Sequence, residues 1–149
     1  MRGFKKSGKQ SIGRSRGGNT TKIHLLSADE KTPVTLSLSE GHKHDAPCGR
    51  ELLSVHGKVQ HITLIADRAY EGDETRALAK DLGYELCIPP KSNRKEPWEH
   101  DTELYKRRNE IERLFRRVQE YRRVFTRYDK LDVMYMGFVV FGFIVETFR

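Results

Sequence analysis

The sequence has 149 residues, enough for one domain with a core of its own, and 33% of them are charged. Lys and Arg number 28 against 21 acidic residues, so the net charge of +7 excludes an acidic disordered chain and favours a polyanionic partner. Two cysteines are too few for a disulfide scaffold or a four-cysteine zinc site. Because the sequence shows neither an apolar secretory signal nor an apolar run long enough to span a bilayer, we expect a cytoplasmic protein with no membrane partner.

Two basic zones flank an acidic middle of the chain. Residues 1–22 carry seven basic side chains and no acidic one, and residues 105–130 carry ten basic and four acidic side chains. Such zones fit a solvated surface, but clustered positive charge is also what neutralises the phosphates of a nucleic acid. The Gly/Ser/Arg-rich stretch 11–18 favours a flexible arm, so we expect an arm over residues 1–19 and a folded domain over residues 20–149.

The first predicted elements are two strands and a short helix. Residues 20–27 are rich in β formers, and residues 34–39 alternate strictly between apolar and polar side chains. This pattern predicts an antiparallel hairpin with one buried face, which ends at Gly41. Asp45 is expected to be the N-cap of a helix over about 46–55.

A strand–helix–strand unit is predicted next. The nearly continuous apolar run 62–66 is typical of a strand covered on both faces, and it ends at Asp67. A helix over about 73–82, stopped by a glycine, then leads to a second strand over 84–88. This order of elements is that of a βαβ unit with parallel strands.

Two helices complete the predicted fold. One is long, over about 103–123, and the other, over about 130–148, is apolar with large side chains all round, so we expect it to be mostly buried. The full order of elements predicts an α/β fold in which a mixed sheet is flanked by helices.

Asp67 is the first candidate catalytic residue. Open α/β sheets bind ligands at the carboxyl ends of their strands, although a turn or cap role is an equal alternative from position alone.

Tyr105, Arg108 and Glu112 are three and four residues apart, so they share one helix face, and Arg108 is expected to hold Glu112 ionised. The same spacing also fits an ordinary surface ion pair. Two carboxylates suit Mg²⁺, but phosphoryl transfer with two metal ions usually needs three or more.

Two further clusters have competing interpretations. His42, His44 and Asp45 resemble part of a zinc site, but no other ligand has a matching spacing, which favours the capping role for Asp45. The aromatic residues that interleave with arginines over 121–128 can stack on bases or pack against the last helix, and packing is the favoured alternative.

Several short motifs together resemble the carboxyl-terminal part of a DDE transposase from a bacterial insertion sequence of the four and five group. The motifs occur in the expected order and cover nearly the whole chain, which makes the set specific although each one alone is weak. They are GGNTTKIH (17–24), ADRAY (66–70), IPPKSNR (88–94), YKRRNEIER (105–113) and RRVFTRYDK (122–130).

The resemblance implies an RNase H-like fold and an enzyme of the bacterial nucleoid. In such enzymes water or a DNA 3′-hydroxyl attacks a phosphodiester with the help of Mg²⁺ or Mn²⁺. By motif, Asp67 resembles the second catalytic acid and Glu112 the third, and both are expected to hold the metal. Tyr105 and Arg108 resemble the two residues that precede and support the third acid.

The expected partner is DNA, both the ends of the element and the target. The residues expected to contact it are Arg14, Arg16, Lys22, Arg113, Arg116, Arg117, Arg122 and Arg123. The sequence departs from the family pattern at Gln119, where a Lys is usual, and neighbouring arginines are candidates to replace its charge. It also departs in lacking the first acid, which the family carries on a strand before the basic arm, since no Asp or Glu precedes Asp29.

We therefore expect the first strand and its acid to come from an upstream segment, encoded in a first reading frame joined by ribosomal slippage or lost from a decayed copy. The leading hypothesis is a transposase catalytic core that cleaves and joins DNA only together with that segment, so that the isolated chain is inactive. The alternative is a non-catalytic DNA-binding fragment or regulator of the element. A stand-alone nuclease is disfavoured because only two candidate catalytic acids, Asp67 and Glu112, are found. A homodimer is compatible with the sequence.

Overall fold

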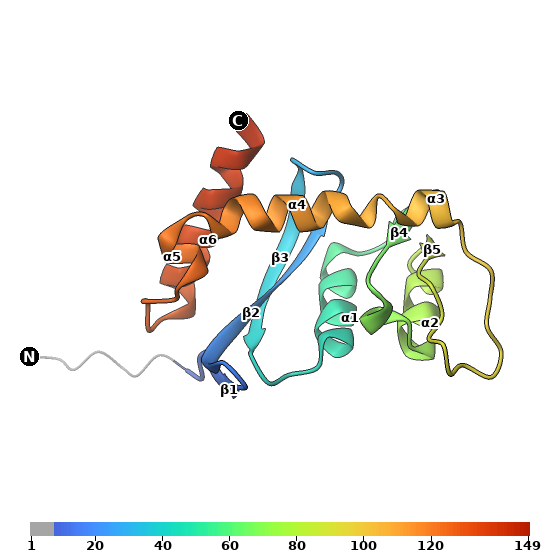
Figure 1. The fold of residues 1–149 in the computed structure, drawn as a ribbon, viewed down its shortest axis with the longest axis horizontal. Helices are drawn as coiled ribbons and strands as arrows, with labels where there is room; N and C mark the ends of the chain where they lie inside the picture. The colour runs from blue at the N-terminus through green and yellow to red at the C-terminus, as the bar shows by residue number, and fades with distance from the viewer. Residues whose placement is uncertain (1–7) are drawn as a thin grey trace, which may run out of the picture.

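The computed structural model describes residues 8–149 of the chain. It confirms an α/β fold, whose arrangement Figure 1 shows. The strands are β1 (Gly13–Ser15), β2 (Gly18–Ser27), β3 (Pro33–Glu40), β4 (Ile62–Ile65) and β5 (Tyr84–Cys87). The helices are α1 (Asp45–His56), a 3-10 turn η1 (Arg68–Tyr70), α2 (Asp73–Asp81), α3 (Thr102–Tyr105), α4 (Arg108–Gln119), α5 (Arg122–Phe125) and α6 (Asp132–Phe148).

The strands form two separate sheets. The predicted hairpin is confirmed, because β2 and β3 are antiparallel with Ile23 opposite Leu38, and β1 extends this sheet on the other edge of β2. The predicted βαβ unit is confirmed as well, since β4 and β5 are parallel neighbours in one sheet and α2 connects them along the chain. The single mixed sheet is not observed: in the described part of the chain no strand joins β2 to β4.

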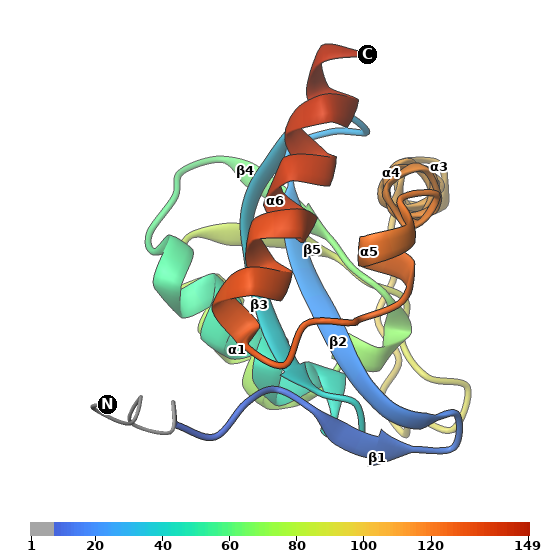
Figure 2. The same cartoon turned by 90° about the vertical axis from the view of Figure 1, so that its left-hand side faces the viewer.

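Two apolar clusters hold these sheets and their helices together. Alternate side chains of β2 point to opposite faces of the hairpin. Ile23 and Leu25 face a cluster formed with α4, α5 and α6, in which Leu114 and Phe143 are almost completely buried. Leu26 contacts the second cluster, which joins α1, α2, β4 and β5. As Figure 2 shows, α6 therefore lies on one face of the hairpin and α1 on the other.

The amino-terminal arm is more ordered than its composition predicts. Within it, Gly13–Ser15 forms strand β1 and pairs with the start of β2. Gly18 has a φ of 98°, a left-handed conformation that glycine adopts without steric cost, so it makes the tight turn between the strands possible. The basic residues before position 8 lie outside the described residues, and the division at residue 19 stays a prediction.

The expected long helix is divided into α3, α4 and α5. Lys106 and Arg107 keep helical angles but accept and donate i→i+3 hydrogen bonds, which tighten the chain between α3 and α4. Tyr121 is extended, with a ψ of 115°, and its hydroxyl donates to Glu146 on α6. This tertiary contact ends the helix before α5. The helical spacing of residues in the sequence cannot predict such a contact with a distant residue.

Three smaller expectations are also wrong. Helix α6 is buried on one side only, and Phe141 on its other side is 62% exposed. Strand β4 is not covered on both faces, because Ile62 at its start is 47% exposed. Asp45 is not an N-cap, since His44 occupies that position and the carboxylate of Asp45 pairs with Lys22 at 2.8 Å. None of the helices among residues 8–149 is long and apolar enough to cross a membrane.

Candidate active site

Asp67 lies just beyond the carboxyl end of β4 and is the N-cap of η1. Its backbone is extended, and its Oδ1 accepts a hydrogen bond from the backbone N–H of Ala69 at 3.1 Å. The other oxygen, Oδ2, faces Arg108 at 3.4 Å. Asp67 thus combines the capping role and the strand-end position that the sequence left as alternatives. The cap fixes the carboxylate while more than half of its surface stays open to solvent.

Arg108 joins the two candidate acids. Its Nη1 contacts the carboxylate of Asp67, which follows β4, and also the carboxylate of Glu112, one turn further along α4. Because oxygens of both carboxylates lie within 3.4 Å of one nitrogen, they are no more than about 7 Å apart, a separation that divalent ions can bridge. The structure therefore brings Asp67 and Glu112 together, as expected. Tyr105 lies beside them, with its ring centre 5.7 Å from the guanidinium carbon of Arg108.

The charge on Arg108 is stabilised by this arrangement. Partial burial opposes the charge, but the hydrogen bond and the negative charge of Glu112, with smaller contributions from Tyr105 and Asp67, outweigh it and raise the pKa of the guanidinium. The guanidinium holds a positive charge between two carboxylates that would otherwise repel each other.

The donor set fits part of a magnesium shell. Carboxylate oxygens are the ligands that Mg²⁺ prefers. However, residues 8–149 contain no cluster of three or more His, Cys, Asp or Glu side chains that could hold a metal ion by itself. Asp67 and Glu112 therefore do not form a complete metal site by themselves, and the zinc interpretation of His42 and His44 gains no third ligand in this part of the chain.

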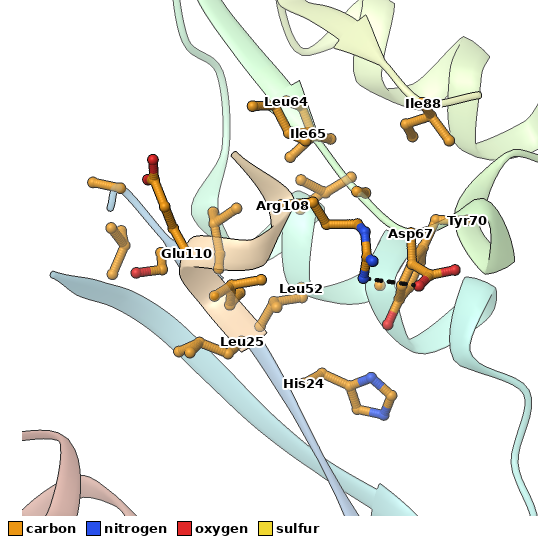
Figure 3. Close-up of a pocket in the computed structure, with 18 of the residues that line it drawn as sticks. His24, Leu25, Leu52, Leu64, Ile65, Asp67, Tyr70, Ile88, Arg108 and Glu110 are labelled. Carbon is orange, nitrogen blue, oxygen red and sulfur yellow. Dashed lines mark hydrogen bonds and ion pairs between the residues drawn. The ribbon is translucent and has the colours of Figure 1, made fainter. Parts of the chain in front are cut away.

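A cavity of about 540 Å³ adjoins Asp67. It is lined by β2, α1, β4 and α4, and Figure 3 shows Asp67, Arg108, Tyr70 and His24 around it together with apolar side chains such as Leu52. Asp67, Arg108 and Tyr70 lie together in Figure 3, whereas Glu110 lies on the other side of the view, and leucine and isoleucine side chains line much of the remainder. Consecutive residues of two strands line this cavity, namely 23–29 and 62–67.

The backbone edges of β2 and β4 face this cavity. Side chains alternate along a strand, so a run of consecutive lining residues means that the edge of the strand, not one face, borders the space. Residues 21–27 pair with β3 on one side only, and β4 pairs only with β5, as far as residues 8–149 show. Each of these strands therefore presents unpaired N–H and C=O groups beside an apolar cavity.

The two bordering strands run in opposite directions. Lys22, in the first half of β2, pairs with Asp45 at the start of α1, and the ring of Tyr70, just after β4, packs on Gly49 of the same helix. The carboxyl end of β4 therefore lies level with the amino-terminal half of β2, an arrangement that can be followed in Figure 2.

Tyr70 and His24 are site residues that sequence reasoning did not single out. Burial, with smaller effects of Asp45, Asp67 and Cys48, raises the pKa of Tyr70 to about 12, so the phenol is neutral beside Asp67. Burial also lowers the pKa of His24, which shares a 2.8 Å hydrogen bond with Ser39. Both residues belong to the quoted motifs, and Gly49 in a helix interior was a further signal that a ring packs closely there.

The candidate DNA-binding residues fall into two groups. Arg14, Arg16 and Arg116 are exposed and form no ion pair within residues 8–149. The others have intramolecular partners: Lys22 with Asp45, Arg113 with Glu30, Arg117 with Glu146, Arg122 with Tyr128 and Arg123 with Asp129. Arg117 reaches a carboxylate that is 1% exposed, so its first role is structural.

Comparisons with known proteins identify the family to which the chain belongs. Residues 1–138 match the family described as the transposase DDE domain. The chain therefore belongs to the DDE transposase family, enzymes of insertion sequences that act on DNA. A protein of Brucella ovis, named "Putative transposase for insertion sequence element IS6501", is 36% identical over 121 residues, which cover 80% of this chain and 92% of that protein. No solved structure matches the chain significantly.

Proposed function

We propose that this chain is the larger part of an RNase H-like catalytic domain that cleaves and joins DNA at the ends of an insertion sequence. It becomes competent when an upstream strand that carries a third acid inserts between β2 and β4. The observation that supports this most strongly is the apolar cavity between two unpaired strand edges, one of which ends at Asp67.

The cavity has the features that an added strand needs. A strand between β2 and β4 would hydrogen-bond to both edges and turn the two sheets into one mixed sheet. Because β2 and β4 are antiparallel to each other, the strand would be parallel to one and antiparallel to the other. If it is parallel to β4, its carboxyl end lies beside Asp67, so an acid there would complete the carboxylate set while apolar residues fill the rest of the cavity.

The roles of the residues follow from their contacts. Asp67 and Glu112 would hold a divalent ion together with the third acid, and Arg108 is a positioning residue whose guanidinium contacts both carboxylates and keeps them aligned. A bound Mg²⁺ supplies Lewis-acid stabilisation of the attacking and leaving oxygens of the phosphodiester. Tyr70 contributes a neutral hydroxyl beside Asp67, and the exposed Arg14, Arg16 and Arg116 would contact phosphates without reading sequence.

A non-catalytic regulator is the second candidate. It is favoured by one observation, that residues 8–149 hold no complete set of three metal ligands. In that case the chain would occupy DNA, or associate with a complete transposase, without cutting.

The experiment that separates the two joins the genomic sequence immediately upstream in frame to residues 1–149 and measures strand transfer of labelled element ends. We expect metal-dependent strand transfer by the fusion. Asp67→Asn and Glu112→Gln should each abolish it and leave DNA binding intact. The matched control is Glu110→Gln on the same helix, whose carboxylate pairs with Arg107 and not with Arg108, and which should keep activity. A fusion that is inactive, or a loss of activity only in Glu110→Gln, would contradict the assignment.

A further inference from the structure

Helix α6 carries a second apolar face that the domain itself does not use. Its inner face packs into the core through Tyr135, Val139 and Phe143, which are all nearly fully buried. On the outer face, Val133 is 72% exposed and Phe148 is 87% exposed.

The exposed residues form one continuous stripe. With 100° of rotation per residue they fall within an arc of about 120°, from the first turn of the helix to the last. None of them is charged, and the helix interior contains no charged residue apart from the buried Glu146. The residues of this outer face are Val133, Gly137, Val140, Phe141, Ile144 and Phe148, with Met134 at its margin.

The area of the outer face matches that of a protein interface. From the exposed fractions of its side chains we obtain on the order of 700 Å², given that a large aromatic side chain buries about 150–250 Å². This exceeds the roughly 300–600 Å² of the largest patch on a typical monomer. It is close to the about 800 Å² that each partner contributes to a standard interface.

Side-chain size along the outer face is graded, which makes the face complementary to itself. Apart from Met134 at the margin, the first half contains only valine and glycine, and Gly137 leaves open space, since a Cβ there would meet no atom within 4 Å. The second half contains the large Phe141, Ile144 and Phe148. If two such helices lie antiparallel, large side chains face small ones, as in well-packed cores. The facing pairs are Val133 with Phe148, Gly137 with Ile144, and Val140 with Phe141.

A parallel pair lacks this fit. It would place Gly137 opposite Gly137 and Phe148 opposite Phe148, which leaves a void at one level and crowding at another. The antiparallel arrangement also aligns the helix dipoles favourably.

We propose that two copies of this chain associate through the outer faces of α6, with the two helices antiparallel about a twofold axis near Val140 and Phe141. The interface leaves the candidate active site free. The inner face of α6 lies on the side of the hairpin opposite α1, whereas the cavity beside Asp67 is lined by α1 and β4.

Sedimentation equilibrium of residues 1–149 through the micromolar range tests the association. We expect a monomer–dimer equilibrium, and Phe141→Glu should raise its dissociation constant at least about tenfold, because a charge at the interface centre loses its hydration. The matched control is Val55→Glu, which puts the same charge on a 73% exposed apolar residue of α1 and should leave the equilibrium unchanged. A wild-type chain that stays monomeric throughout, or a Phe141→Glu chain that is as dimeric as wild type, would overturn the proposal.

Disulfide cross-linking tests the relative orientation of the two α6 helices in a dimer whose central interface residues are unchanged. In a Cys48→Ser background, an equimolar mixture of the Val133→Cys and Phe148→Cys chains should form a disulfide-linked heterodimer on mild oxidation. Each variant alone should remain uncross-linked, because identical positions at one end of α6 lie far apart in the antiparallel pair. Efficient cross-linking of either variant with itself would contradict the antiparallel arrangement. Circular dichroism confirms that each variant is folded.

Discussion

The contact between Gly49 and Tyr70 gives a sharp test of how the fold positions the candidate site. Gly49 lies inside α1, where glycine is less favourable than alanine by about 0.5–1 kcal/mol. A Cβ at this position would lie only 2.5 Å from Cε1 and 2.7 Å from Cδ1 of Tyr70. Normal carbon–carbon contacts are about 3.5–4.0 Å, so Gly49→Ala must push the ring away by about 1 Å.

We expect Gly49→Ala to destabilise the protein by about 1–3 kcal/mol, the usual cost of overpacking. For a chain of this length, each kcal/mol lowers the melting temperature by about 2–4 °C. Thermal unfolding measured by circular dichroism gives this value. Gly17→Ala is the control, since a Cβ there would meet only the Ser15 hydroxyl at 3.9 Å, and it should change little.

A double-mutant cycle identifies the ring as the cause. In a Tyr70→Ala background the clash is gone, so Gly49→Ala should become neutral or stabilising, by up to about 1 kcal/mol from helix propensity. If Gly49→Ala costs the same with and without the ring, or costs nothing in the wild type, the packing argument is wrong.

Three further outcomes are expected. Burial of Glu146 opposes its ionisation, but hydrogen bonds from Tyr121 and Arg149 and the charges of Arg149 and Arg117 outweigh it and lower the pKa of the carboxyl below its ordinary 4.5. The stabilisation from the ionised Glu146 is therefore present at neutral pH and is lost as pH falls through the lowered pKa. Glu146→Gln should reduce the free energy of unfolding by about 1–3 kcal/mol at pH 7. It should also weaken the fall of that free energy toward acid pH, which urea titrations at several pH values measure. DNA binding should be insensitive to sequence and should weaken with salt: the logarithm of the binding constant should fall against the logarithm of the salt concentration with a slope of roughly −5 if about six phosphates are neutralised. Arg116→Ala should make this slope shallower by about 1. A slope near zero would contradict electrostatic binding. Residues 1–149 alone should not cleave or join DNA with Mg²⁺ or Mn²⁺, and robust strand transfer by that chain would show that no third acid is needed.

Local patterns were sufficient for the elements whose partners are close in sequence. The hairpin of β2 and β3 and the β4–α2–β5 unit follow from alternation, apolar runs and glycine stops. Patterns failed where a distant contact decides the outcome. Helix α4 ends before Tyr121 because that side chain reaches Glu146, and Asp45 turns to Lys22 instead of capping α1.

The site was predictable in part for the same reason. Helical spacing placed Arg108 beside Glu112, and the strand-end position made Asp67 a candidate. That Arg108 also contacts Asp67, 41 residues earlier, depends on how α4 crosses β4, and no periodicity contains this information. A gap beside the two acids was expected from the missing first strand that the resemblance implies, whereas its apolar lining depends on how the two sheets pack against the helices.

Amide hydrogen exchange of the isolated chain and of the fusion with its upstream segment tests the central claim most directly. In residues 1–149 alone, the amides of β2 and β4 that point away from β3 and β5 should exchange rapidly, since they face the cavity unpaired. In the fusion, the account predicts protection of both sets of amides together, at residues 23–27 and 62–65, because a single inserted strand bonds to both edges. Rapid exchange at both edges in a fusion that carries out strand transfer would contradict it.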